Sequence, residues 1–330
     1  MHRRPLYPLR FDPIYQYRLW GGRRLGELLT APLPVDSPIG EAWVLSDRED
    51  HPSLVASGPL QGRTIGQLID EFPEDLMGKL AARFHRFPLL LKFLDVHEML
   101  SVQVHPGDER TDLLRAGETG KTEAWVVLEA VPASRIYAGL KSGTTLADLR
   151  KSLRDGTLPH RLRCVVPQAG DGVLIPAGTV HSLGGDVMVF EIQENSDVTF
   201  RLYDWGHVDS KTGQPRPLQV EQALASVCFG ENSAGLVTPA VESTTPIRRE
   251  QLFNDEHFLL WRLRGQSPFS VGSPDAPRVL VCVEGAGHLE DDEETYAVGR
   301  GDVWLLPSVL GACTFRPIDS VTLLEIAIPE

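Results

Sequence analysis

The sequence predicts a mainly β protein built from two related barrels, and three observations lead to this prediction. Its 330 residues include 30 glycines and 25 prolines. These residues separate many short apolar or alternating runs, which is typical of short strands joined by tight turns. The phrase Gly301-Asp-Val-Trp-Leu-Leu-Pro307 repeats the spacing and chemistry of Gly170-Asp-Gly-Val-Leu-Ile-Pro176, so the chain carries a weak internal repeat. The expected strands before residue 230 cover residues 88–95, 99–105, 123–130, 135–139, 172–176, 186–193 and 197–203.

A few short helices are expected outside these strands. Thr64-Ile-Gly-Gln67 has the spacing of a capping box, and residues 73–84 begin with a proline and two acids, which favours a helix start. Residues 144–156 offer a threonine cap, leucines at helical spacing and a closing glycine. We therefore expect helices near the N-terminus and a small helical excursion at about 141–163.

One linker is expected to divide the chain. Residues 230–246 are rich in Gly, Ser, Thr and Pro, a composition that marks a connection between folded units. We expect a catalytic domain over residues 1–235 and a degenerate second domain over residues 247–330. In the second repeat Pro307 is followed by Ser-Val-Leu-Gly, without a histidine at the spacing found after Pro176, so we expect no metal site there.

Composition narrows the classes of partner. The formal net charge of -13 argues against nucleic acid or an anionic membrane, because binding to either needs clustered Lys and Arg. The four cysteines are far apart and form no C-x-x-C pair, and no run is long enough to cross a bilayer. We expect a cytoplasmic protein whose partner is a small molecule, and no feature of the sequence specifies its oligomeric state.

A histidine follows the first copy of the repeated phrase. Residues Gly170 to His181 fit the second cupin motif, G-x5-P-x-G-x2-H, in which a strand and a Pro-Gly turn present the histidine to the interior of a barrel. A lone histidine after a turn would more often be a surface or core residue. The turn spacing makes His181 a candidate metal ligand instead.

Polar and apolar side chains alternate along two further segments. In Leu100-Ser-Val-Gln-Val-His105, Ser101, Gln103 and His105 share one face of the expected strand. Buried polar groups need partners, and an imidazole with an amide oxygen two residues away can share a metal. Lys121 and Glu123 share a face by the same parity. A solvated polar face and an exposed Lys-Glu pair are the alternatives that these segments leave open.

A third alternation follows Glu191. Asp197, Thr199 and Arg201 point to one side of the expected strand, and Val198, Phe200 and Leu202 point to the other. Periodicity alone leaves two interpretations open, a surface ion pair or one wall of a barrel.

Taken together, these motifs resemble the type I phosphomannose isomerases, in the short bacterial form. The resemblance covers most of the chain and is carried by Leu19-Trp-Gly-Gly, Gly40-Glu-Ala-Trp, Leu100-Ser-Val-Gln-Val-His-Pro, Gly120-Lys-Thr-Glu, Pro176-Ala-Gly-Thr-Val-His and Gln193-Glu-Asn-Ser-Asp-Val-Thr-Phe-Arg. It implies a double cupin, made of two jelly-roll barrels. It also implies an enzyme that interconverts mannose 6-phosphate and fructose 6-phosphate through an enediol.

The resemblance further implies which residues form the site. Arg201 matches the family's catalytic position, and Asp197 matches a residue proposed to assist proton transfer. Ser101 and Lys121 match positions that line the substrate site. The implied cofactor is one zinc ion per chain, with the ligands Gln103, His105, Glu123 and His181.

Chemical reasoning leaves the general base open between Lys121 and Asp197. A nearby dication would lower the pKa of Lys121, whereas Asp197 is already basic but weak unless it is desolvated. The substrate's phosphate needs cations, and Lys121 and Lys92 are candidates, with Ser101 as a hydroxyl donor. A lysine that holds phosphate cannot also be the base.

Two rival functions remain at this point. A metal-dependent cupin oxygenase needs two histidines and one carboxylate, which His105, Glu123 and His181 would supply. A non-catalytic sugar-binding cupin is the other rival, although the chain shows no basic helix-turn-helix pattern. Gln103, Arg201 and Lys121 favour an anionic sugar over oxygen chemistry.

Overall fold

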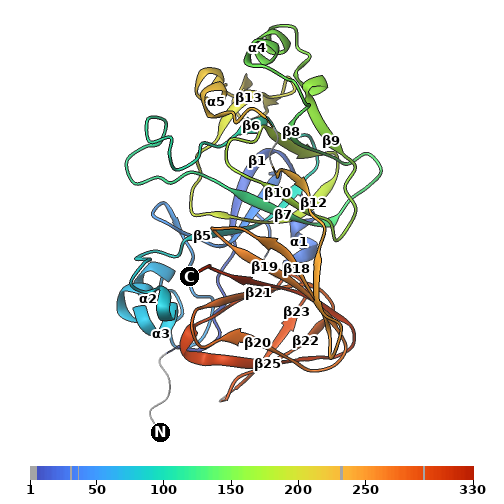
Figure 1. Ribbon diagram of the computed structural model, residues 1–330. Coiled ribbons are helices and arrows are strands. Elements are labelled where there is room, and N and C mark those ends of the chain that lie inside the picture. Colours follow the sequence, from blue (N-terminus) through green and yellow to red (C-terminus); the bar gives the residue numbers. More distant parts are fainter. Residues whose placement is uncertain (1–5, 30–31, 36, 231–232, 293) are drawn as a thin grey trace.

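The computed structural model describes residues 6–29, 32–35, 37–230, 233–292 and 294–330, and it is mainly β (Figure 1). Residues 14–236 form two sheets, which we call the first barrel. Its seven-stranded sheet has the order β1 (Ile14–Gly22), β2 (Ile39–Leu45), β5 (Leu89–Val96), β12 (Val187–Glu194), β7 (Glu123–Glu129), β10 (Gly172–Ile175) and β16 (Gly235–Leu236). Its five-stranded sheet has the order β13 (Phe200–Tyr203), β6 (Val102–Val104), β11 (His181–Gly184), β8 (Arg135–Leu140) and β9 (Leu162–Val165).

Residues 240–327 repeat this arrangement, and we call them the second barrel. Its six-stranded sheet has the order β17 (Ala240–Ser243), β18 (Arg248–Asn254), β19 (Leu259–Gly265), β26 (Val321–Ala327), β21 (Arg278–Glu284) and β24 (Val303–Leu306). Its four-stranded sheet has the order β20 (Phe269–Ser273), β25 (Gly311–Pro317), β22 (Ala286–Glu290) and β23 (Thr295–Gly299). The strand order β5-β12-β7-β10 is matched by β19-β26-β21-β24, as the internal repeat predicts.

The two barrels are stacked through their large sheets (Figure 1). One apolar core lies between these sheets, where Phe93 of the first barrel belongs to the same cluster as Phe253 and Leu324 of the second. Separate cores fill each barrel, and a fourth lies under the helices α4 (Leu146–Arg154) and α5 (Val220–Ser226) at the top of Figure 1. The N-terminal segment joins the second barrel, because Leu9 pairs with Leu305.

Strand alternation in the seven-stranded sheet decides which side chains enter the first barrel. Lys92 on β5 and Glu191 on β12 point inward, whereas their neighbours Phe93 and Phe190 point into the core between the barrels. Both faces of the sheet are buried, which is why its central strands are almost continuously apolar. The inward charged residues are exceptions, and such groups need partners when buried.

The helices are short, as predicted. Thr64 caps α2 (Ile65–Glu71) and Thr145 caps α4, each through a capping box. Residues 73–84 do not form one helix, because α3 (Pro73–Met77) ends at Gly78, which has a φ of +57° and lies against the backbone of Asp275. The other elements are α1 (Leu25–Leu28), the 3-10 turns η1 (Gly78–Leu80), η2 (Leu158–Arg161) and η3 (Ser308–Leu310), and the two-stranded pairs β3 (Asp47–Arg48) with β4 (His51–Pro52) and β14 (Val208–Asp209) with β15 (Gln214–Pro215).

Candidate active site

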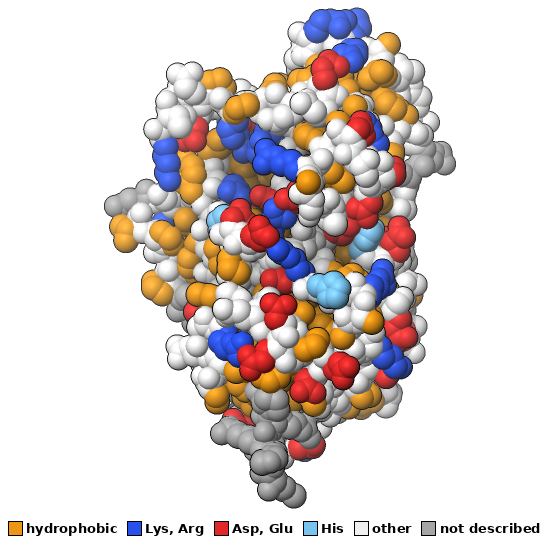
Figure 2. Space-filling model, turned by 90° about the vertical axis from the view of Figure 1, so that its left-hand side faces the viewer, with side chains coloured by type: hydrophobic (Ala, Val, Ile, Leu, Met, Phe, Trp, Pro, Cys, Tyr) orange, Lys and Arg blue, Asp and Glu red, His pale blue; other side chains and the backbone are white. Residues whose placement is uncertain are grey.

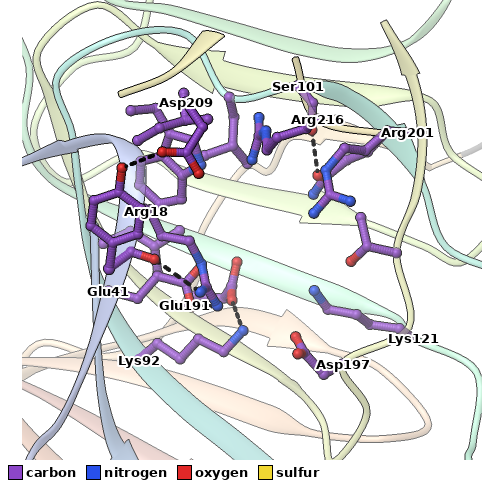
Figure 3. A pocket seen from close by; sticks show the side chains of 17 residues that line it. Arg18, Glu41, Lys92, Ser101, Lys121, Glu191, Asp197, Arg201, Asp209 and Arg216 are labelled. Carbon is purple, nitrogen blue, oxygen red and sulfur yellow. Dashed lines mark hydrogen bonds and ion pairs between the residues drawn. The ribbon is translucent and has the colours of Figure 1, made fainter. Parts of the chain in front are cut away.

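A polar pocket of about 410 Å³ opens into the first barrel. Lys and Arg side chains gather around a hollow in the upper half of the face shown in Figure 2, and Figure 3 shows the lining at close range. The pocket is lined by Tyr17, Arg18, Leu19, Trp20, Glu41, Lys92, Leu94, Leu100, Ser101, Gln103, Lys121, Glu191, Asp197, Thr199, Arg201, Asp209 and Arg216. It therefore brings together all the predicted catalytic and substrate residues, namely Lys92, Ser101, Lys121, Asp197 and Arg201.

Three of the four predicted metal ligands form one buried cluster. His105 follows β6, whereas Glu123 and His181 are the first residues of β7 and β11. The Nε2 atoms of His105 and His181 lie 3.4 and 3.2 Å from the two carboxylate oxygens of Glu123. Each side chain is at most 1% exposed. Among the described residues this is the one group of three or more such side chains that could hold a metal ion.

The two imidazoles are oriented through their other nitrogens. His105 Nδ1 lies 2.7 Å from the carbonyl oxygen of Val198, and His181 Nδ1 lies 2.8 Å from that of Thr179. A carbonyl can only accept, so each Nδ1 carries the hydrogen and each Nε2 presents a lone pair to the cluster. Burial lowers the pKa of His105 to about 3 and also lowers that of His181, so both rings are neutral. Neutral imidazole is the form that binds a metal.

The unpaired atoms of this cluster fit a bound cation. His105 Nε2 and both carboxylate oxygens of Glu123 are buried and make no hydrogen bond of normal geometry with the described residues. Lys121 Nζ lies 2.7 Å from one of these oxygens as an ion pair. Two imidazole nitrogens and a carboxylate are donors that zinc accepts, so the donor set suits that ion.

Gln103, the fourth predicted ligand, lies beside this cluster. In the strand pairing it is opposite both His181 on β11 and Arg201 on β13. Its amide nitrogen lies 3.2 Å from His181 Nε2, and its amide oxygen accepts a hydrogen bond from Ser101 at 3.2 Å. The oxygen and nitrogen of an amide exchange places on a half-turn. A half-turn would direct the oxygen of Gln103 to the cluster as a ligand.

The Pro-Gly turn before His181 depends on glycine. Gly178 has a φ of +79°, which side chains rarely allow. Its N–H donates to the carbonyl oxygen of His105 at 2.8 Å. The turn is thereby tied to the backbone of one histidine while it delivers the other, as the motif predicts.

The buried lysines of the pocket are engaged with carboxylates and an amide. Lys92 Nζ donates to the amide oxygen of Gln193 at 2.6 Å. It also lies 3.1 Å from Glu191, as Figure 3 shows. Lys121 is paired with Glu123, and this carboxylate and Glu191 raise its pKa although burial lowers it. Each of the two ammonium groups therefore has an anionic neighbour.

Arginines of the pocket form a second group, and sequence reasoning missed two of them. Arg18 makes a bidentate pair with Glu41 at 2.9 and 3.1 Å, and Arg216 makes one with Asp204 at 2.9 and 2.5 Å. Arg201 forms no such pair with the described residues, and its buried Nε makes no hydrogen bond with them. Burial and the charge of Arg216 lower the pKa of Arg201. An anion beside Arg201 would therefore relieve an unfavourable charge.

The carboxylates of the pocket differ in their surroundings. Burial raises the pKa of Glu41, but the charges of Arg18 and Lys92 and the hydrogen bonds from Arg18 and Trp43 together outweigh burial and lower this pKa to about 2. Asp197 is exposed and lines the pocket from the segment before β13, with Thr199 on the same side. Its side chain forms no hydrogen bond or ion pair within 4 Å with any described residue, so it is free to meet a ligand.

Comparisons with known proteins point to one family. Residues 9–123 match the family model of the phosphomannose isomerase type I catalytic domain. Mannose-6-phosphate isomerase ManA of Bacillus subtilis is 33% identical over 316 residues, which span 92% of this chain and 94% of that protein. The chain belongs to the type I phosphomannose isomerase family.

Further relatives in this family cover nearly the whole chain. Mannose-6-phosphate isomerase of Streptococcus mutans is 32% identical over 311 residues, covering 93% of this chain and 95% of that one. The crystal structure of the Bacillus subtilis mannose 6-phosphate isomerase superposes with a TM-score of 0.89 at 29% identity, covering 98% of this chain and all of that one. A putative mannosephosphate isomerase from Archaeoglobus fulgidus shares the fold, with a TM-score of 0.78 at 22% identity and 99% coverage of each chain. The predicted double-cupin fold of a phosphomannose isomerase is thus confirmed.

Proposed function

We propose that the chain is a zinc-dependent mannose-6-phosphate isomerase that interconverts mannose 6-phosphate and fructose 6-phosphate. The observation that carries this proposal is the composition of the pocket in a chain of the type I phosphomannose isomerase family. In it a group of His105, Glu123 and His181 adjoins a cavity rich in arginine and lysine. Gln103 completes the proposed ligand set for one zinc ion per chain.

The reaction moves a proton between C1 and C2 of the sugar while charge develops on the oxygens of those carbons. When bound, zinc supplies Lewis-acid chemistry that polarises such oxygens. Arg201 offers a planar set of donors to the same developing charge, and its unpaired Nε favours an anionic partner. Ser101 donates its hydroxyl hydrogen to the amide oxygen of Gln103, and a half-turn of that amide would release this hydrogen for donation to the sugar.

Two residues are proposed as the group that carries the proton, Lys121 and Asp197. Lys121 is 4% exposed and in contact with Glu123, whereas Asp197 is exposed and without a partner among the described residues. Asp197 can therefore approach a substrate without breaking an ion pair, and we propose it first. A general base also has to reach the proton that it removes, so geometry precedes pKa in this choice.

The phosphate of the substrate requires cations in an otherwise acidic chain. Lys92 and Lys121 remain proposed contributors, but both ammonium groups already have carboxylate neighbours. Arg201 and Arg216 lie near one another in the pocket and repel (Figure 3). Arg216 keeps its Nε and Nη2 on Asp204, so a phosphate dianion there would pair mainly with Arg201 and with the remaining Nη1 of Arg216, and this end of the pocket is the favoured place for it.

The experiment that tests the proposal is an isomerase assay with metal analysis of the same sample. Purified protein is offered mannose 6-phosphate, other hexose and pentose phosphates, and mannose without phosphate. We expect fructose 6-phosphate to form, about one zinc per chain, and a large loss of kcat/KM for mannose. Absence of ketose formation by zinc-loaded protein would refute the function. Iron with oxygen uptake would favour the oxygenase, which family membership does not support.

The domain limits and the location follow as further proposals. We propose a catalytic domain over residues 1–235 and a second domain over residues 247–330 that holds no metal. We also propose a cytoplasmic location, which the cysteines support, because all four lie among the described residues and none is in a disulfide. Within the described residues no helix has the length and apolar character needed to span a membrane.

A further inference from the structure

Glu194 is a buried charged residue that lies outside the substrate pocket. It ends β12, where alternation turns it away from the interior of the first barrel, and only 7% of it is exposed. It lines a separate cavity of about 650 Å³ together with His257, which lies just before β19 of the second barrel. Burial of a carboxylate costs free energy unless the group is paired or hydrogen-bonded, so the partners of Glu194 indicate its role.

Glu194 holds Thr122 at both of its backbone groups. Its carboxylate accepts the N–H of Thr122 at 2.6 Å, and its own N–H donates to the carbonyl oxygen of Thr122 at 3.3 Å. Thr122 lies between Lys121 and Glu123, which enter the site on either side of it. The shorter of these hydrogen bonds, at 2.6 Å, is therefore made with the peptide group that joins Lys121 to Thr122.

Thr122 also connects to the turn that precedes His181. Its hydroxyl accepts the N–H of Ala177 at 3.2 Å. Ala177 lies within the turn from Pro176 to Gly178. Glu194, Thr122 and Ala177 therefore form a chain of hydrogen bonds behind two of the proposed metal ligands.

The second barrel contributes to this chain through His257. Its Nδ1 lies 3.4 Å from the other carboxylate oxygen of Glu194. Burial raises the pKa of Glu194 to about 6, the Thr122 N–H and His257 oppose that rise, and Asp108 and Asp255 add to it. His257 and the Thr122 N–H are the groups that favour the charged carboxylate.

We propose that Glu194 is a positioning residue for the isomerase site: by holding the backbone of Thr122 it fixes the directions of Lys121 and Glu123, with His257 supporting it from the second barrel. This inference rests on the proposed function. Glu194 does not line the substrate pocket, so it acts through its neighbours rather than on the sugar.

The test compares zinc-loaded Glu194→Ala and Glu194→Gln with the full-length wild type. We measure kcat per bound zinc, KM, the rate of zinc release to a chelator, and Tm. For Glu194→Ala we expect kcat and zinc retention to fall on the order of 10-fold, as for other partners that orient metal ligands, with KM nearly unchanged. Glu194→Gln keeps an oxygen acceptor and should recover most of both losses.

The matched control is Glu256→Ala, which removes an exposed carboxylate that lines the same cavity. It gives up only a 3.8 Å approach to His257 Nε2 and leaves the 2.6 Å contact of Glu194 with Thr122 in place, so kcat and zinc retention should stay at the wild-type values. Wild-type kcat and zinc release in Glu194→Ala would overturn the proposal. So would a Glu194→Gln variant as impaired as Glu194→Ala at an unchanged Tm. If Glu194→Ala does not fold, Glu194→Asp replaces it, because the shorter side chain also loses the 2.6 Å contact.

The zinc-release measurement distinguishes a failure of the proposed isomerase function from a failure of the positioning role of Glu194. Slow release by the wild type and faster release by Glu194→Ala, without isomerase activity in either, would refute the function and leave the positioning role. An active wild type whose zinc release is unchanged by the substitution would refute the positioning role alone.

Discussion

The two barrels share a turn at the same place in the repeat. In the first barrel the N–H of Gly170 donates to the carbonyl oxygen of Val127 at 2.8 Å, and in the second the N–H of Gly301 donates to that of Cys282 at 2.8 Å. The two glycines have φ values of +91° and +90°. Each turn leads into a strand, β10 or β24, that pairs with the corresponding neighbour, β7 or β21. The backbone of the repeat is therefore preserved in both copies.

The side chains beyond the turn differ. Pro176 is followed by a glycine turn and by His181, which enters the polar site of the first barrel. Pro307 is followed by η3 and by β25, whose Cys313 and Phe315 join an apolar core that fills the second barrel. The two barrels thus have the same backbone arrangement but different interiors. The inward-facing side chains of a few strands decide whether a barrel has a polar binding site.

The largest effect is expected when the first barrel loses His181, because this residue distinguishes its interior from that of the second barrel. We expect His181→Ala to lose bound zinc and turnover, because removing one ligand weakens the site and admits water. The loss of kcat should exceed the roughly 100-fold that marks the upper range for partners outside the ligand set. Metal analysis and steady-state kinetics check this. Stoichiometric zinc with normal activity would contradict the assignment of the site.

A smaller effect is expected from Arg201, which faces the pocket but is not a proposed ligand. Loss of one preorganised donor costs about 3 kcal/mol, so kcat of Arg201→Ala should fall about 100-fold or more while zinc stays bound. Arg201→Lys keeps the charge but not the planar set of donors, and should remain impaired. Kinetics with metal analysis decide between roles. A raised KM with unchanged kcat would place Arg201 on the phosphate in the ground state, and lost zinc would indicate a structural role.

Within the ligand set, Gln103 should matter less than His105. A neutral amide oxygen is a poorer zinc donor than an imidazole, so Gln103→Ala should raise the Kd for zinc by a smaller factor than His105→Ala. Chelator competition on the two variants measures both constants. Equal or greater weakening by Gln103→Ala would show that the amide is a full partner in the cluster.

The fold and the grouping of His105, Glu123 and His181 were predictable because their signals are local. A capping box spans four residues, as at Thr64, and the turn before His181 is set by a proline and a glycine a few positions away. Alternation along residues 100–105 placed Gln103 and His105 on the inner face, and Val102 and Val104 lie in the core outside the five-stranded sheet. Alternation of this kind is seen where one face of a strand lines a polar site and the other packs in an apolar core.

The remaining features depend on contacts between distant segments. Arg18 enters the pocket from β1, and Arg216 follows a hairpin that Tyr17 binds through a 2.9 Å hydrogen bond to Asp209. No spacing in the sequence places these residues beside Arg201. The partners of Lys92 lie about a hundred positions away, and Glu194 meets Thr122 across 72 positions. Only the paired strands of the sheet bring them together.

The smallest expected effect belongs to the second barrel, where His288 is the histidine nearest to the repeated turn in sequence. His288 is exposed on β22, while its neighbour Leu289 is buried in the core. Burial raises the pKa of the Cys282 thiol to about 12, so this side chain is a neutral thiol and a poor metal ligand at neutral pH. We therefore expect His288→Ala to keep the zinc content and kcat of the wild type. Metal analysis and kinetics measure both, with His181→Ala as the contrasting variant, and a second tightly bound metal that disappears in His288→Ala would show that both barrels bind metal.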